Sequence, residues 1–181
     1  MADRFGDPTA RLQGRVTLNP IPHIDPIGTL LFPLILAFAG APVFGWAKPV
    51  MVNSYNLRQP RHDHMFIAAA GPLANLSTAF LGILIFLLLK GTFFFKIIPL
   101  VFFLLYLIMI NVYLAVFNLL PIHPLDGSGI AEGLLKGQAL YSYVRLRPYS
   151  FIILMVVLFS GLLGVIARPI QMMIFSILGL R

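Results

Sequence analysis

The spacing of charged residues constrains this chain more than any other feature of its sequence. Five stretches contain no Asp, Glu, Lys or Arg, and they cover residues 26–47, 65–89, 97–125, 148–167 and 169–180. A helix needs about 20 apolar residues to cross the hydrocarbon core of a bilayer. The first four stretches are long enough to span a membrane, whereas the last is too short to do so unaided.

The composition agrees with a membrane location. Of the 181 residues, 59% are hydrophobic and only 10% are charged, whereas about a quarter of the residues in a soluble domain carry charge. The net charge of +7 does not indicate nucleic-acid binding, because the basic residues lie between the apolar stretches, where they can face anionic lipid. The chain has no cysteine, so any metal would be held by His, Asp or Glu.

We therefore expect an all-α polytopic membrane protein with about four transmembrane helices, forming a single membrane-embedded domain over residues 1–181. Pro33, Gly40 and Pro42 predict a kink in the first span. Before that span, the run Arg15–Asn19 predicts a short extended or β segment. In lipid such a segment is tolerated only against protein or beside a wet cavity.

Asp126 is the residue most open to a chemical role. It follows 29 residues, Ile97–Leu125, that include no Asp, Glu, Lys or Arg. An ionisable residue beside an apolar membrane helix is costly, and its presence is by default a hypothesis of function. The structural alternative is an Asp-Gly turn after a helix that Pro121 and Pro124 have already broken. The residues alone leave both interpretations open.

A second polar candidate, Asn75, lies in the second apolar stretch. That stretch opens with small residues, among them Gly71 and Ala74, which let helices approach closely in lipid. Asn75 follows Gly71 by four residues and so shares its helix face. Because an unpaired amide in hydrocarbon is costly, we expect Asn75 to face the third apolar stretch rather than lipid.

Five segments carry recognisable motifs: Ala2–Arg15 with its Phe-Gly-Asp-Pro, Leu18–Gly28 with Asn-Pro-Ile-Pro-His, Gly45–Pro49, Ala70–Asn75 with Gly-Pro-Leu-Ala-Asn, and Asn118–Gly127 with Leu-Asp-Gly. Together and in this order they resemble the site-2 protease family of intramembrane zinc metalloproteases, in its small bacterial-type form without a PDZ domain. The resemblance covers a core of residues 2–133. The C-terminal residues 148–180 match only as hydrophobic helices.

The resemblance implies a zinc endopeptidase that cleaves transmembrane segments of membrane-protein substrates and has no nucleic-acid partner. It also implies a multi-pass protein in the cell membrane of a bacterium. In that family two histidines and a glutamate of a His-Glu-x-x-His helix, together with the aspartate of Leu-Asp-Gly, build the site around one Zn²⁺. By resemblance, Asp126 is a zinc ligand, and Asn75 and Asn118 are polar supports near the substrate or the oxyanion.

The sequence departs from the family because it contains no His-Glu-x-x-His. In relatives that motif lies just before the segment matching Ala2–Pro8, so we expect the natural enzyme to be longer and the printed chain to be inactive by itself. The histidines that are present are poor substitutes. His123 precedes a proline and so avoids the helical conformation, His62 and His64 are expected in a polar loop, and His23 fits a turn.

Two other functions stay open. The first is a catalytically inactive scaffold in the membrane that binds helices of other proteins without cleaving them, which zinc content would distinguish from a protease. The second is a small transporter that uses Asp126 and Asn75 as a polar path across the bilayer. A transporter of this kind would need inverted repeats, and the sequence shows none.

Overall fold

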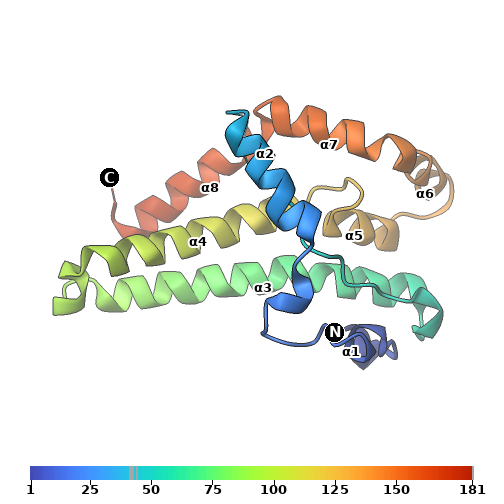
Figure 1. The fold of residues 1–181 in the computed structure, drawn as a ribbon, viewed down its shortest axis with the longest axis horizontal. Helices are drawn as coiled ribbons and strands as arrows, with labels where there is room; N and C mark the ends of the chain where they lie inside the picture. Colours follow the sequence, from blue (N-terminus) through green and yellow to red (C-terminus); the bar gives the residue numbers. More distant parts are fainter. Residues whose placement is uncertain (41–42, 44, 181) are drawn as a thin grey trace. The chain divides into compact units, whose positions relative to one another are not determined.

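The computed structural model describes residues 1–40, 43 and 45–180. The chain divides into two compact units, Met1–Asp63 and His64–Arg181. Every regular element among the described residues is helical (Figure 1). The expected all-helical fold class is thus confirmed, while the expectation of one domain over the whole chain stays a prediction.

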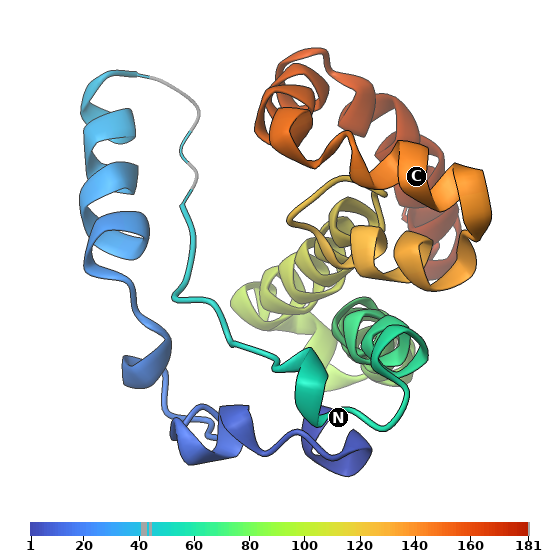
Figure 2. The same cartoon turned by 90° about the vertical axis from the view of Figure 1, so that its right-hand side faces the viewer.

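The first unit consists of short helical turns separated by prolines and glycines. Residues 45–50 run back along the helical turns without regular structure of their own (Figure 2). Two backbone hydrogen bonds hold this return segment: Trp46 N–H donates to the Gly28 carbonyl at 3.0 Å, and Lys48 N–H donates to the His23 carbonyl at 2.9 Å. The elements are η1 (Ala2–Phe5), α1 (Thr9–Leu12), η2 (Ile21–His23), η3 (Pro26–Leu31, a π-helix), α2 (Phe32–Phe38) and η4 (Ser54–Asn56).

The segment Arg15–Asn19, expected to be extended, forms bends instead of a β-strand. Thr17 Oγ1 accepts a hydrogen bond from Asn19 N–H at 3.1 Å, and Asn19 Oδ1 accepts one from Ile21 N–H at 3.1 Å. Short polar side chains that bond the nearby backbone compete with strand pairing in this way. Within the described residues there is no neighbouring strand with which Arg15–Asn19 could pair as a β-strand.

The first apolar stretch forms a helix that is shorter than expected. Its helical part covers Pro26–Phe38, which is too short to span a bilayer by itself. Gly40 has φ 65°, in the left-handed region, directly after the helix. A left-handed glycine ends α-helices. The kink expected at Pro42 falls, with residues 41 and 44, outside the described residues.

Asp7 joins the two ends of the first unit. Its buried carboxylate accepts hydrogen bonds from Thr9 N–H at 3.1 Å, from Asn53 N–H at 2.8 Å and from the Asn56 amide at 2.9 Å. The hydrogen bonds from the Thr9 and Asn56 side chains favour the ionised form and lower the pKa of Asp7 from 3.8 to about 2.

We expect the first unit to open in acid and in Asp7 variants. Because the folded pKa is lowered, the stabilisation from Asp7 is complete above about pH 4. It is lost as the pH falls towards about 2. Asp7→Ala should therefore increase protease cleavage within residues 1–63 severalfold at neutral pH. Asp3→Ala is the matched control, since the Asp3 carboxylate forms an exposed ion pair with Arg11 at 3.3 Å, which contributes little to stability. Equal cleavage of both variants would contradict the assignment.

Three helical stretches among the described residues are long and apolar enough to cross a membrane: Pro60–Leu89, Ile98–Asn118 and Gly137–Phe159. The first of these is α3, which begins five residues before the apolar stretch at Met65. The carboxylate of Asp63 explains the early start, because it accepts the Gln59 N–H at 2.8 Å. The others comprise α4 (Ile98–Asn118), and α6 (Gly137–Val144), η6 (Arg147–Tyr149) and α7 (Ser150–Phe159) in succession.

The apolar core of the second unit lies between α3, α4 and the last helix, α8 (Leu162–Leu178). Figures 1 and 2 show α3 and α4 lying side by side, with α8 alongside α4. The close approach of α3 and α4 depends on Gly82, where a methyl group would lie 2.8 Å from Ile108 Cγ1. The buried core residues are Ala79, Phe86, Leu104, Ile108, Val112, Ile174 and Leu178.

The C-terminal apolar stretches divide at a different place from the one expected. The helix of the fourth stretch ends at Phe159, because Gly161 has φ 75°, and Ser160 Oγ accepts the Leu162 N–H at 3.2 Å. Helix α8 then runs through Arg168 and Pro169, where the fourth and fifth apolar stretches of the sequence divide. At the C-terminal end of α8, Lys90 Nζ donates a hydrogen bond to the Leu178 carbonyl at 2.5 Å.

Candidate functional site

Asp126 is the first residue of a helix rather than part of a turn that ends one. Helix α4 ends at Asn118, the loop 119–125 follows, and α5 runs over Asp126–Leu134. A carboxylate in the first turn of a helix interacts favourably with the helix dipole. Helix α4 ends before the two prolines of the loop, as expected, and a new helix begins directly after the loop.

The loop before Asp126 is folded closely onto the start of α5. A side chain at Gly127 would overlap the carbonyls of Leu119 and Leu120, so only glycine fits there. Ser128 Oγ donates to the Leu125 carbonyl at 2.7 Å. The position of Asp126 is therefore tied to the path of the loop 119–125.

The Asp126 carboxylate lies against α3 at Gly71. A methyl group added at Gly71 would lie 2.6 Å from Asp126 Oδ2. Real Cβ atoms do not approach that closely, so the absence of a side chain at Gly71 makes room for the carboxylate. This contact joins two of the sequence motifs, Gly-Pro-Leu-Ala-Asn and Leu-Asp-Gly, at one place in the second unit.

Two further glycines bring α5 onto the start of α3. A methyl group at Gly129 would lie 2.9 Å from Ala68 Cβ, and one at Gly133 would lie 2.5 Å from Met65 Cβ. Small residues permit this close approach where hydrophobic burial gives no driving force between helices. Residues in ascending order on α5 meet residues in descending order on α3, so the two helices pack antiparallel.

The environment of Asp126 favours its neutral form. The residue is half-buried, and burial raises the pKa of its carboxyl, while the nearby His64 acts in the opposite direction. Within the part of the chain that the structure describes, no hydrogen bond or ion pair reaches this carboxylate. A half-buried carboxyl with a perturbed pKa and no fixed partner is typical of functional sites.

His64 belongs to this site, which the sequence did not predict. His62 and His64 were expected in a polar loop, but both lie within α3. The His64 ring faces α5, with its Cε1 3.0 Å from the position of a methyl group on Gly129. Pro60 is the signal that could have revealed this, because proline is favoured in the first turn of a helix.

The residues at this site do not fit a complete zinc centre. Among the described residues no group of three or more His, Asp or Glu side chains is placed to hold a metal ion. A protein zinc site normally needs three or four such ligands. Asp126 and His64 therefore supply part of a ligand set at most.

Asn75 and Asn118, the two predicted polar supports, are both half-buried. Asn118 is the last residue of α4. Asn75 shares one face of α3 with residues that follow helical spacing and are buried, namely Ala68, Pro72, Ala79, Gly82 and Phe86. The functional roles of both asparagines stay predictions.

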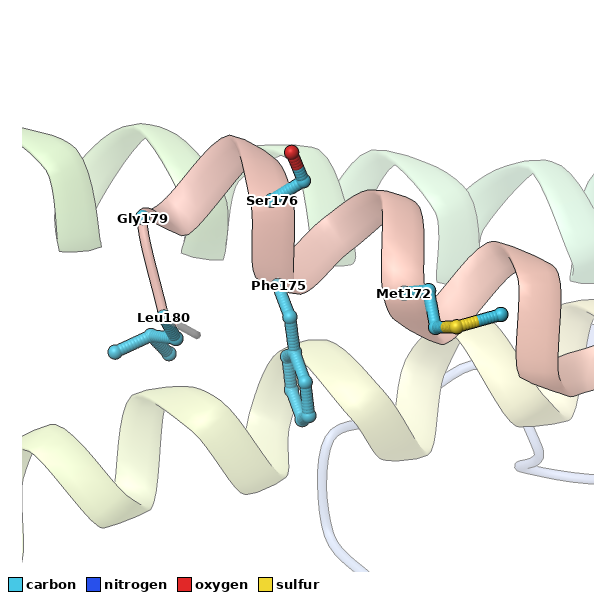
Figure 3. A pocket seen from close by; sticks show the side chains of 5 residues that line it. All are labelled: Met172, Phe175, Ser176, Gly179 and Leu180. Atoms are coloured by element: carbon cyan, nitrogen blue, oxygen red, sulfur yellow. The ribbon is translucent and has the colours of Figure 1, made fainter.

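Two hollows in the second unit lie away from Asp126. One, of about 520 Å³, is at the end of α8 (Figure 3) and is lined by Met172, Phe175, Ser176, Gly179 and Leu180. The other, of about 630 Å³, lies between α4 and α8 and has mainly apolar and aromatic walls. Neither is lined by Asp126, Asn75 or Asn118, so neither coincides with the predicted site.

Comparison with known proteins gives consistent results. The model of the family described as Peptidase family M50 matches residues 96–161. The "Putative zinc metalloprotease YwhC" of Bacillus subtilis (strain 168) is 36% identical over an alignment 182 residues long, and the alignment covers 93% of this chain and 76% of that protein. The "Putative zinc metalloprotease Rip2" of Mycolicibacterium smegmatis (strain ATCC 700084 / mc(2)155) is 31% identical over 164 residues.

The match to Rip2 covers 89% of this chain but only 60% of that relative. No solved structure matches the chain. The identity to YwhC, at 36% over most of both proteins, decides the assignment, and it agrees with the apolar helices and with the motifs around Gly71 and Asp126. The chain belongs to peptidase family M50, the site-2 proteases.

Proposed function

We propose that this chain acts as an intramembrane zinc metalloendopeptidase, in a protein whose His-Glu-x-x-His segment precedes the printed residues. Its substrates are transmembrane segments of other membrane proteins, and its location is the cell membrane, which it crosses several times. The observation that carries the proposal is the half-buried carboxylate of Asp126, which lies against Gly71 and has no hydrogen-bond partner among the described residues, in a chain of this family.

Four residues have functional roles in this proposal: Asp126, Gly71, Asn75 and Asn118. Asp126 is one protein ligand of the metal, and an ionised oxygen is a ligand that zinc accepts. Gly71 keeps open the space that the carboxylate occupies. Asn75 and Asn118 bind polar groups of the substrate where its helix has unwound, because backbone groups freed in lipid need partners.

We expect the 181-residue chain, purified by itself, to retain far less than one zinc ion per molecule. One carboxylate with a neighbouring histidine cannot replace a site that needs three protein ligands. Zinc measured by elemental analysis after dialysis against a mild chelator checks this. Retention of one zinc per chain would contradict it, and single alanine variants of the four histidines would then identify the ligands.

The proposed function itself is tested with the protein expressed from its full natural reading frame. We expect an in-frame His-Glu-x-x-His upstream, one bound zinc, and cleavage of a model transmembrane substrate that stops when the zinc is removed. An inactive scaffold is the second candidate, because the described residues lack a complete ligand set. Substrate binding with neither zinc nor cleavage would establish the scaffold instead.

A further inference from the structure

Glu132 of α5 lies at the centre of a charge cluster that joins three segments of the second unit. Its Oε1 is 3.0 Å from His123 Nε2, in the loop before Asp126. Arg147 of η6 binds both carboxylate oxygens through Nη2, at 2.6 Å and 2.8 Å, and its Nε is 3.2 Å from Oε1. The loop, α5 and η6 are therefore connected through one carboxylate.

This cluster differs from an ordinary surface ion pair. The side chain of Glu132 is only 17% exposed and that of His123 is 24% exposed. The Arg147 side chain is 51% exposed, so water and salt partly screen this pair, but its bidentate contact with the shielded carboxylate gives it a fixed geometry. Glu132 is thus suited to hold its two partners at defined positions.

The loop 119–125 is also held by α6, the helix that precedes η6. The Tyr143 hydroxyl, on α6, donates to the Pro121 carbonyl at 2.9 Å. The rings of Tyr143 and His123 are also in contact, with centroids 5.9 Å apart. Two neighbouring points of the loop are therefore fixed to the segment formed by α6 and η6.

The attached loop leads directly to the candidate metal ligand, Asp126, at the start of α5. His123 precedes Asp126 by three residues and Glu132 follows it by six, so the Glu132–His123 contact closes a short ring of chain around Asp126. The carboxylate of Asp126 meets α3 at Gly71, where the fit leaves no spare space. A small displacement of the loop would therefore change where the Asp126 oxygens lie.

We infer that Glu132 is a positioning residue, which holds the loop 119–125 through His123 and Arg147 and so sets the place of the Asp126 carboxylate on α3. This inference rests on the proposed function only for its effect on catalysis. Its structural part, the holding of the loop, is measured independently of any activity.

The structural part is tested with a cysteine reporter in the full-length protein. The 181 residues contain no cysteine, and any cysteine elsewhere in the full-length protein is first replaced by serine. Ser128, 5% exposed beside the loop, can be replaced by cysteine with little change in size. We expect Ser128→Cys to react slowly with a maleimide in the presence of a chelator. Adding Glu132→Ala should raise the labelling rate at least severalfold, while Glu132→Gln, which keeps an acceptor oxygen, should raise it less.

Arg145→Ala is the matched control. Arg145 lies two residues from Arg147 but contacts the Tyr141 ring, with 5.8 Å between its guanidinium carbon and the ring centroid. Its loss should leave the labelling rate unchanged. If Glu132→Ala does not accumulate in the membrane, Arg147→Ala is used instead of it in every comparison. Arg147→Ala removes the arginine from the same cluster. Unchanged labelling in the Glu132 or Arg147 variant would overturn the inference.

The catalytic part is tested by cleavage of a model transmembrane substrate by the same proteins without the reporter. Misplacing a ligand through its outer partners typically costs ~10- to 100-fold in activity. We expect a loss of that size for Glu132→Ala, mainly in kcat, with partial recovery in Glu132→Gln and none of this loss in Arg145→Ala. Full activity of Glu132→Ala would overturn the inference. If the parent protein fails to cleave, the proposed function fails, and the labelling experiment still decides whether Glu132 holds the loop.

Discussion

Asp126→Asn in the full-length protein is expected to abolish proteolysis almost as completely as Asp126→Ala. A neutral amide is a poor ligand for a dication that prefers an ionised oxygen. Loss of outer partners already costs ~10- to 100-fold, so loss of a direct ligand should cost more than roughly 100-fold. Both variants should also retain less zinc, as measured by elemental analysis.

The contrast between the two variants separates a ligand from a structural residue. If Asp126 served only to begin α5, asparagine would replace it well, because asparagine supports the same local backbone conformations. Near-normal cleavage by Asp126→Asn would then rule out the ligand assignment. Membrane insertion should be normal in both variants, because removing a charge leaves the apolar spans intact.

Gly71→Ala is expected to lower cleavage by ~10- to 100-fold, the range seen when a metal ligand is misplaced. The added methyl group would lie 2.6 Å from Asp126 Oδ2, so either the carboxylate or α5 must move away from α3. Alanine is otherwise favoured over glycine within helices. The variant should therefore insert and fold while its activity falls, as a substrate cleavage assay with measured membrane levels would show.

Gly82→Ala provides the control for general effects of crowding on α3. Its methyl group would lie 2.8 Å from Ile108 Cγ1, on the face that packs against α4, and would not approach Asp126. If the activity of Gly71→Ala falls simply because α3 is overpacked, the two variants will lose activity to the same extent. A selective loss in Gly71→Ala would instead link the activity to the carboxylate.

The spacing of charges predicted the helical membrane fold, because length and hydrophobicity are local properties of the sequence. Helix boundaries were harder to predict, since they depend on local bonds that override hydrophobicity. Asp63 extended α3 backwards through the bond to Gln59, and Gly161 divided an apolar stretch that contains no charge. The bends at Arg15–Asn19 replaced an extended segment because Thr17 and Asn19 satisfy the backbone locally.

For the candidate site, the sequence identified Asp126 and the motif around Gly71, but not their contact. That contact depends on the packing of α5 on α3 through Gly129 and Gly133, which joins residues far apart in the chain. The positions of His64 and Glu132 depend on the same packing. A sequence pattern shows residue types and spacing along one helix, whereas the meeting of two helices requires the fold.

The contact between Lys90 and the Leu178 carbonyl ties the C-terminal end of α8 to the end of α3. A lysine side chain near the C-terminus of a helix satisfies carbonyls that the last turn leaves unpaired and interacts favourably with the helix dipole. The 17 residues of α8 rise about 26 Å, slightly less than the hydrocarbon thickness of about 30 Å. At the other end of α8 the Ser160 hydroxyl has a similar role, because it accepts the Leu162 N–H and so satisfies a backbone group that has no partner within the helix.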